Sequence, residues 1–76
     1  MYQDDSERKS AFNALYDAHY AAVRAYAWRR EPTLVDDIVA ETFLVAWRRF
    51  EDIPAEAALP WLLVVSRNAL LNMQRG

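Results

Sequence analysis

Apolar residues recur at helical spacing in the first part of the chain and predict a helix over residues 11–30. The side that faces the core should carry Phe12, Leu15, Tyr16, Val23, Tyr26 and Ala27. Ser10 is suited to cap the start of this helix, because its hydroxyl can accept from a free backbone N–H. Pro32 should end the helix, because proline disfavours helical geometry in the residue before it. We expect residues 1–9 to form a flexible tail.

A second amphipathic pattern predicts a helix from Thr33 to about Phe50. The segment Thr33-Leu34-Val35-Asp36 resembles a capping box. One face of the helix should carry Val35, Val39, Phe43, Ala46, Trp47 and Phe50. At about 100° per residue, the opposite face carries Asp37, Ala40, Glu41, Leu44 and Arg48. A solvated face is the simplest interpretation of these five residues, although a central leucine among charges also suits a protein partner.

Pro54 interrupts the helical pattern, so residues 51–59 should form a connector with room for a short extra turn of helix. A third helix is predicted over about residues 60–75, and it opens with proline, a favoured first-turn residue. Its opening segment, residues 61–65, is apolar on every side. One side of this segment should pack against the core, and the other should be covered or exposed for use.

These patterns predict an all-α fold, a compact bundle of three main helices in one domain at residues 10–76. A chain of 76 residues buries a modest core, but 54% of its residues are hydrophobic. With one glycine and three prolines, the sequence leaves little room for long irregular loops. The prediction is therefore of helices joined by short connections.

The sequence contains no catalytic set. It has no cysteine, which excludes disulfides and thiolate metal sites. His19 is the only histidine, lacks a second metal ligand at suitable spacing, and is interpreted as an ordinary surface or boundary residue. The single glycine excludes a glycine-rich phosphate loop. We therefore predict no metal, no cofactor and no enzymatic activity. Because there is no membrane-length apolar run and no signal-like N-terminus, we predict a cytoplasmic protein.

Charge is distributed unevenly along the chain. The net charge of −2 argues against a binder of bulk phosphate, which usually carries a basic surplus. All eleven acidic residues lie within residues 1–56, whereas residues 57–76 carry only basic charge. This last part offers hydrogen-bond donors at Arg67, Asn68, Asn72 and Arg75. Together with the ring of Trp61, such side chains suit unstacked bases better than duplex phosphate. Trp61 is more readily interpreted as a core residue, and its ring can also form a wall of a site.

Three motifs, taken in order, resemble those of extracytoplasmic-function sigma factors of the sigma-70 family. Residues 36–47, which read Asp-Asp-Ile-Val-Ala-Glu-Thr-Phe-Leu-Val-Ala-Trp, resemble the second conserved region. Pro60-Trp61-Leu62 and residues 65–70 (Val-Ser-Arg-Asn-Ala-Leu) resemble the Trp-Leu and Ala-Arg-Asn signature. Residues 12–20 resemble the opening helix. The resemblance extends over about residues 10–75 and implies that this is region 2, the domain that recognises the promoter −10 element.

The resemblance implies a role for each predicted element. The second helix should dock on the clamp helices of the largest RNA polymerase subunit through Asp37, Ala40, Glu41, Leu44 and Arg48. The connector should capture a base flipped from the −10 element, through Ile53, Pro54, Ala55, Glu56, Ala57, Ala58 and Leu59, with Trp61 nearby. The third helix should line the non-template single strand with Arg67, Asn68, Asn72 and Arg75. An anti-sigma factor is a further partner that the resemblance implies.

The chain also departs from the family pattern. Ala40 stands where the family usually has glutamine, and the connector reads Pro-Ala-Glu-Ala-Ala in place of its frequent arginine and glycine. Glu56 would be unfavourable near phosphate, or would read a base donor such as a cytosine amine. These departures leave a second hypothesis open. In it, the chain is a helical protein-interaction domain of the same fold that binds an anti-sigma factor or another regulator without reading DNA.

Overall fold

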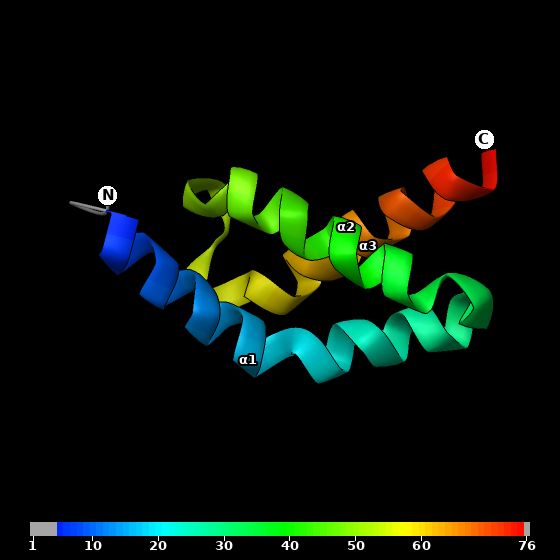
Figure 1. Cartoon of the computed structure of the whole chain (residues 1–76), viewed down its shortest axis with the longest axis horizontal. Helices are drawn as coiled ribbons and strands as arrows, with labels where there is room; N and C mark the ends of the chain where they lie inside the picture. Colours follow the sequence, from blue (N-terminus) through cyan, green and yellow to red (C-terminus); the bar gives the residue numbers. More distant parts are fainter. Residues whose placement is uncertain (1–4, 76) are drawn as a thin grey trace.

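Three α-helices account for most of the protein, in a computed structural model that describes residues 5–75. They are α1 (Asp5–Arg30), α2 (Val35–Arg48) and α3 (Ala58–Arg75). Short 3₁₀ turns connect them: η1 (Pro32–Leu34), η2 (Phe50–Asp52) and η3 (Ala55–Ala57). Figure 1 shows α1 along the long axis, α2 returning antiparallel to it, and α3 running back beside both. The described residues therefore confirm the predicted all-α bundle of three main helices, with extra helical turns in the connector.

The core lies where the three helices meet. Its buried apolar side chains are Val23, Ala27, Val35, Ile38, Val39, Phe43, Ala46, Leu62 and Leu70. Ile38 and Leu62 are the largest side chains that lose all contact with solvent. The hydroxyl residues Thr42 and Ser66 are fully buried as well, at the contact between α2 and α3. The buried sides of the three helices thus face a shared interior, which fixes the outward faces of α2 and α3. Tyr16, predicted to face the core, is exposed instead.

The first helix begins earlier than the sequence pattern predicts. It starts at Asp5, so residues 5–9, expected as part of a tail, are helical, and residues 1–4 lie outside the described residues. The prediction that Ser10 caps the helix is wrong, because Ser10 lies inside it. The extension has a tertiary cause. Arg8 reaches from this first part of α1 past the end of α2 to η2, where it donates to the Glu51 carboxylate.

The second helix differs from the prediction at both ends. Thr33 does not cap it, because Thr33 belongs to η1 and its hydroxyl donates to Oε2 of Glu31 at 2.6 Å. At the other end, α2 stops at Arg48, and Phe50 lies in η2. The third helix starts two residues early, at Ala58, which puts Pro60 in its first turn. Proline is tolerated there because the first backbone N–H groups of a helix have no partner within the helix.

A row of aromatic rings joins α1 to α2. The ring centroids of Phe12 and Trp47 lie 5.3 Å apart in an edge-to-face arrangement. Those of Tyr16 and Phe43 lie 4.6 Å apart. Offset and edge-to-face ring pairs add to the stabilisation from buried area. Phe12 also contacts Phe50, so the row continues into the connector and fixes its position against α1.

Candidate functional site

The five residues predicted to bind a protein partner lie on one side of α2. Asp37, Ala40, Leu44 and Arg48 are exposed, and Glu41 is half-buried. Leu44 keeps 42% of its surface exposed. This arrangement agrees with the prediction from helical spacing, because the opposite side of α2 supplies much of the core. The face therefore presents an apolar side chain with charged groups around it.

The connector residues fall into groups with different surroundings. Ala58 is buried, and Ile53, Pro54, Ala57 and Leu59 are half-buried. Ile53 and Leu59 pack against the core, so their apolar surface serves the fold as well. The remaining members of the predicted set, Ala55 and Glu56, are exposed. The seven residues therefore differ in exposure, and only Ala55 and Glu56 among them are fully accessible to a partner.

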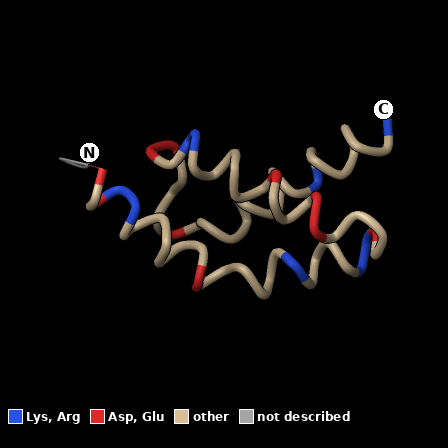
Figure 2. The backbone as a smooth tube through the Cα atoms, in the orientation of Figure 1, with Lys and Arg blue, Asp and Glu red and all other residues tan. Residues whose placement is uncertain are grey.

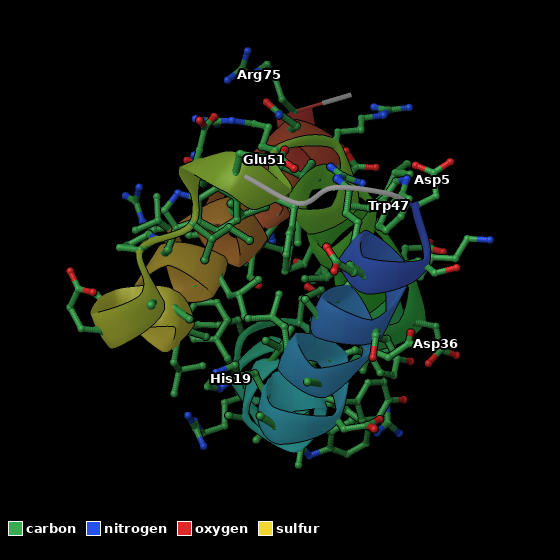
Figure 3. All side chains as sticks on the ribbon, turned by 90° about the vertical axis from the view of Figure 1, so that its left-hand side faces the viewer. Asp5, His19, Asp36, Trp47, Glu51 and Arg75 are labelled. Carbon is green, nitrogen blue, oxygen red and sulfur yellow. The ribbon has the colours of Figure 1, made fainter. Side chains whose placement is uncertain are left out.

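A hollow of about 390 Å³ lies between the connector and α1. From the connector side it is lined by Phe50, Ile53, Ala55 and Ala58, and from α1 by Ala11, Ala14, Leu15 and His19. Only three residues of the predicted connector set take part. The α1 contribution was missed by the sequence analysis, although Ala11, Leu15 and His19 are spaced four residues apart and so share one helix face. Figure 3 shows His19 between α1 and the part of the chain that leads into α3.

The exposed side of α3 carries hydrogen-bond donors and no acidic residue. Arg67, Asn68, Asn72 and Arg75 are all exposed, as the sequence predicts for a strand-binding face. In Figure 2 the charged segments along α3 are blue. Trp61 behaves differently from these four residues, because it is half-buried against the core. The Arg49 guanidinium lies 5.5 Å from the centroid of the Trp61 ring. The ring therefore serves the core and a surface contact at once.

A narrow groove of about 130 Å³ joins the exposed sides of α2 and α3. It is lined by Glu41 and Val45 of α2, by Arg49 just after this helix, and by Val65, Asn68, Ala69 and Asn72 of α3. The groove thus brings Glu41, predicted to meet a protein, close to Asn68 and Asn72, predicted to meet nucleic acid. Helical spacing within one helix cannot reveal this closeness, because it depends on how α2 and α3 pack. The two predicted surfaces are continuous in the structure.

An arginine from α1 holds the end of α2 and the start of the connector. The Arg8 guanidinium donates to the backbone carbonyl of Trp47 and, at 2.9 Å, to Oε2 of Glu51. It also lies 4.2 Å from the centroid of the Trp47 ring. The hydrogen bond from Arg8 is the main cause that holds the pKa of Glu51 below its usual value. Arg8 thereby satisfies a carbonyl at the C-terminal end of α2, where helices lack internal donors.

Two further features bear on the class of site. Within residues 5–75, no three His, Cys, Asp or Glu side chains gather in a way that could hold a metal ion. No helix in the described part of the chain is long and apolar enough to span a membrane. The residues predicted to bind partners lie on the α2 face, in the connector, on the α3 face and in the groove between these two helices.

The chain was compared with known proteins. Residues 15–76 match the family model described as Sigma-70 region 2, which covers most of the chain. The match includes α2, the connector and α3, and the larger part of α1. No curated protein and no solved structure gave a match.

Proposed function

The chain belongs to the sigma-70 region 2 family, and from that premise we propose that it is the region 2 domain of an extracytoplasmic-function sigma factor. The family acts with RNA polymerase in recognition of the promoter −10 element, and it is not a family of enzymes. The finer proposal has two parts. The α2 face docks on the clamp helices of the largest polymerase subunit. The connector and α3 bind the non-template single strand, and so melt the −10 element in the cytoplasm.

One observation carries this proposal: the α2 face and the α3 face meet in a single groove. A domain that holds polymerase on one side and opened DNA on the next needs two such adjoining surfaces of different chemistry. The α2 face has charges of both signs around Leu44, whereas α3 has donors and no acid. Polymerase bound to α2 would therefore present the opened strand directly to α3.

Docking through α2 fits the general anatomy of protein interfaces. An exposed leucine can enter an apolar depression on the partner, and the charges around it exclude water and fix the register. Leu44 would be that anchor, with Asp37, Glu41 and Arg48 around it. Ala40 leaves space where the family usually has glutamine, so less of the contact should come from this position.

Strand binding through α3 fits a domain that is not basic overall. The net charge of −2 gives little attraction for duplex phosphate, which binds proteins by counterion release. Bases that have left the stack can be held by side-chain amides and rings instead. Asn68 and Asn72 supply amides on the exposed side of α3. Capture of such bases offsets the cost of unstacking and thereby favours the open promoter.

The alternative is a protein-interaction domain of the same fold that binds an anti-sigma factor or another regulator and no DNA. The exposed carboxylate of Glu56 favours it, because this group lies in the connector where a base and its phosphate would approach. Docking through Leu44 would persist under this alternative. The two functions therefore differ in DNA binding as well as in the protein partner.

A selection experiment separates the two functions. The chain, mixed with core polymerase, is used to select from a random library of single-stranded oligonucleotides, and fluorescence anisotropy then measures the affinity for the enriched sequence. We expect one enriched −10-like sequence that binds more tightly than its scrambled control, and weaker binding by Asn68→Ala. If no sequence is enriched and anisotropy shows no preference, the DNA-reading function is wrong and the protein-interaction alternative stands.

A further inference from the structure

The hollow between α1 and the connector contains a single polar side chain, that of His19. The other seven residues that line it are alanines, aliphatic residues and one phenylalanine. Four of the eight are alanines, and their small side chains leave the space between α1 and the connector open. The volume of about 390 Å³ falls in the usual range of small-molecule sites. The hollow can therefore accept a molecule of the size of a nucleobase, with little beyond His19 to hydrogen-bond it.

His19 is placed to reach what enters. Its side chain is half-buried at the wall that α1 forms, and Figure 3 shows it between α1 and the chain that leads into α3. No hydrogen bond or ion pair joins the imidazole to another of the described side chains. A neutral imidazole offers one donor and one acceptor, which can address the carbonyl, ring nitrogen or amine at the edge of a base. Both groups are available to an incoming ligand.

The walls of the hollow favour a planar ring over a charged group. Phosphate or a carboxylate would lose hydration among the alanines and gain no cationic partner there. A base has two apolar faces and a polar edge, and aromatic side chains such as Phe50 stack on such faces. The phosphate can stay outside, because the hollow is open to solvent.

We propose that His19 determines base specificity at one promoter position by hydrogen-bonding the edge of an unstacked base held in this hollow. This inference rests on the proposed function, because it requires that the chain bind single-stranded DNA. It adds a residue of α1 to a site otherwise expected from the connector alone. Without His19 the hollow would select a base by shape only. It would then distinguish purines from pyrimidines, but it would not distinguish two bases of equal size.

Since His19 is the only histidine, its ring protons give a single resolved reporter in a proton NMR spectrum. The oligonucleotide selected with polymerase is titrated into the chain. The titration is then repeated with a series of oligonucleotides, each of which has an abasic site at a different nucleotide. We expect the His19 signal to shift on binding, and the shift to be lost when one particular nucleotide is abasic. Abasic sites at the other nucleotides should lower the affinity, but the His19 signal of the saturated complex should keep the same chemical shift.

Variants then test specificity at that nucleotide. His19→Leu should reduce the discrimination among the four bases by about fivefold, the usual weight of one hydrogen bond. His19→Gln should retain part of it, because the amide also has a donor and an acceptor. Asn13→Leu is the matched control, since Asn13 is an exposed polar residue of α1 that does not line the hollow, and it should leave the discrimination unchanged.

The outcomes separate this inference from the proposed function. Sequence-specific binding with an unmoved His19 signal and unchanged discrimination in His19→Leu overturns the inference and leaves the proposed function intact. Binding to no sequence overturns both. A His19 signal that moves only with a polymerase fragment and not with DNA also overturns the inference, because the hollow then holds a protein side chain.

Discussion

The side-chain hydroxyls of Thr42 and Ser66 meet at 2.8 Å between α2 and α3, in an otherwise apolar interior. Each hydroxyl also lies within hydrogen-bond distance of a carbonyl one turn earlier, Thr42 from Ile38 at 2.7 Å and Ser66 from Leu62 at 2.9 Å. Two hydroxyl protons thus serve three contacts. At any moment one hydroxyl donates to the other and the second donates to its own helix. The pair thus joins α2 to α3 by a hydrogen bond between side chains in the core.

A double-mutant cycle should reveal this coupling. Thr42→Val keeps the shape of the side chain and removes one hydroxyl, and Ser66→Ala removes the other. Neither change strands a buried donor, because the remaining hydroxyl can still donate to its own helix carbonyl. We expect each single change to lower the free energy of unfolding by about 1 kcal/mol, and the double change to cost less than their sum. Urea denaturation, monitored by circular dichroism, measures the free energy of unfolding of the single and double variants. If the losses from the two single changes add up to that of the double change, the hydroxyls do not interact.

Removal of the Arg8 side chain should destabilise the fold and loosen the connector. Arg8→Ala removes the guanidinium from the Trp47 ring and from the Glu51 carboxylate. We expect a loss of about 1 kcal/mol in the free energy of unfolding, typical of a partly desolvated cation–π contact. Lys9→Ala is the control, since Lys9 is the exposed neighbour on the same helix. Equal stability of the two variants in urea would show that the Arg8 contacts contribute nothing.

The same contact predicts a dependence of stability on pH. The Arg8 hydrogen bond lowers the pKa of Glu51 in the folded chain below the value in the unfolded chain. The ionised carboxylate therefore stabilises the fold above the usual glutamate pKa of about 4.3, and this contribution is lost as the pH falls through the lower, folded-state value. Because Glu51 is exposed, high salt should weaken the effect. Unfolding curves are measured from neutral to acidic pH. The free energy of unfolding should fall less with pH for Glu51→Gln than for the parent chain. An equal fall in the two proteins would contradict this account.

The outward face of α2 was predictable because it depends on one helix alone. Once Val39, Phe43 and Ala46 are assigned to the core, the helical repeat directs Glu41 and Leu44 outward. The exposed donors of α3 were predictable from residue type alone, because arginine and asparagine are seldom fully buried. The capping prediction for Thr33 failed because hydrogen bonding around Glu31 and Thr33 depends on the 3₁₀ turn that precedes α2. A short polar segment is compatible with more than one such arrangement.

Features that join distant residues escaped the sequence analysis. Arg8 and Glu51 are 43 residues apart, and no local pattern indicates that they meet. His19 was interpreted as an ordinary helical histidine, because the hollow beside it exists only where α1 packs against the connector. The closeness of Glu41 to Asn68 and Asn72 has the same origin in helix packing. The exposed surfaces were therefore predictable one helix at a time, but their arrangement was not.

Because Glu41 lines the shared groove, Glu41→Lys should lower the affinity for polymerase and raise the affinity for the single strand. Reversal of this charge on the docking face should weaken binding to a clamp-helix fragment of polymerase by about tenfold, because a register-setting charge becomes repulsive. Since Glu41 lines the groove with Asn68 and Asn72, the same change replaces a negative charge beside the strand by a positive one. Affinity for the selected single strand should rise, with a steeper dependence on salt.

A matched charge reversal tests whether position matters in this prediction. Asp17→Lys makes the same change in net charge at an exposed site of α1 outside the groove, so it should raise strand affinity less and leave clamp binding unaltered. Anisotropy titrations with the labelled strand and with the labelled clamp fragment, each at several salt concentrations, give both affinities for the three chains. If Glu41→Lys leaves clamp affinity unchanged, polymerase does not dock through this face. If its gain in strand affinity only equals that of Asp17→Lys, the strand does not pass along the groove, because general electrostatic attraction then accounts for the whole effect.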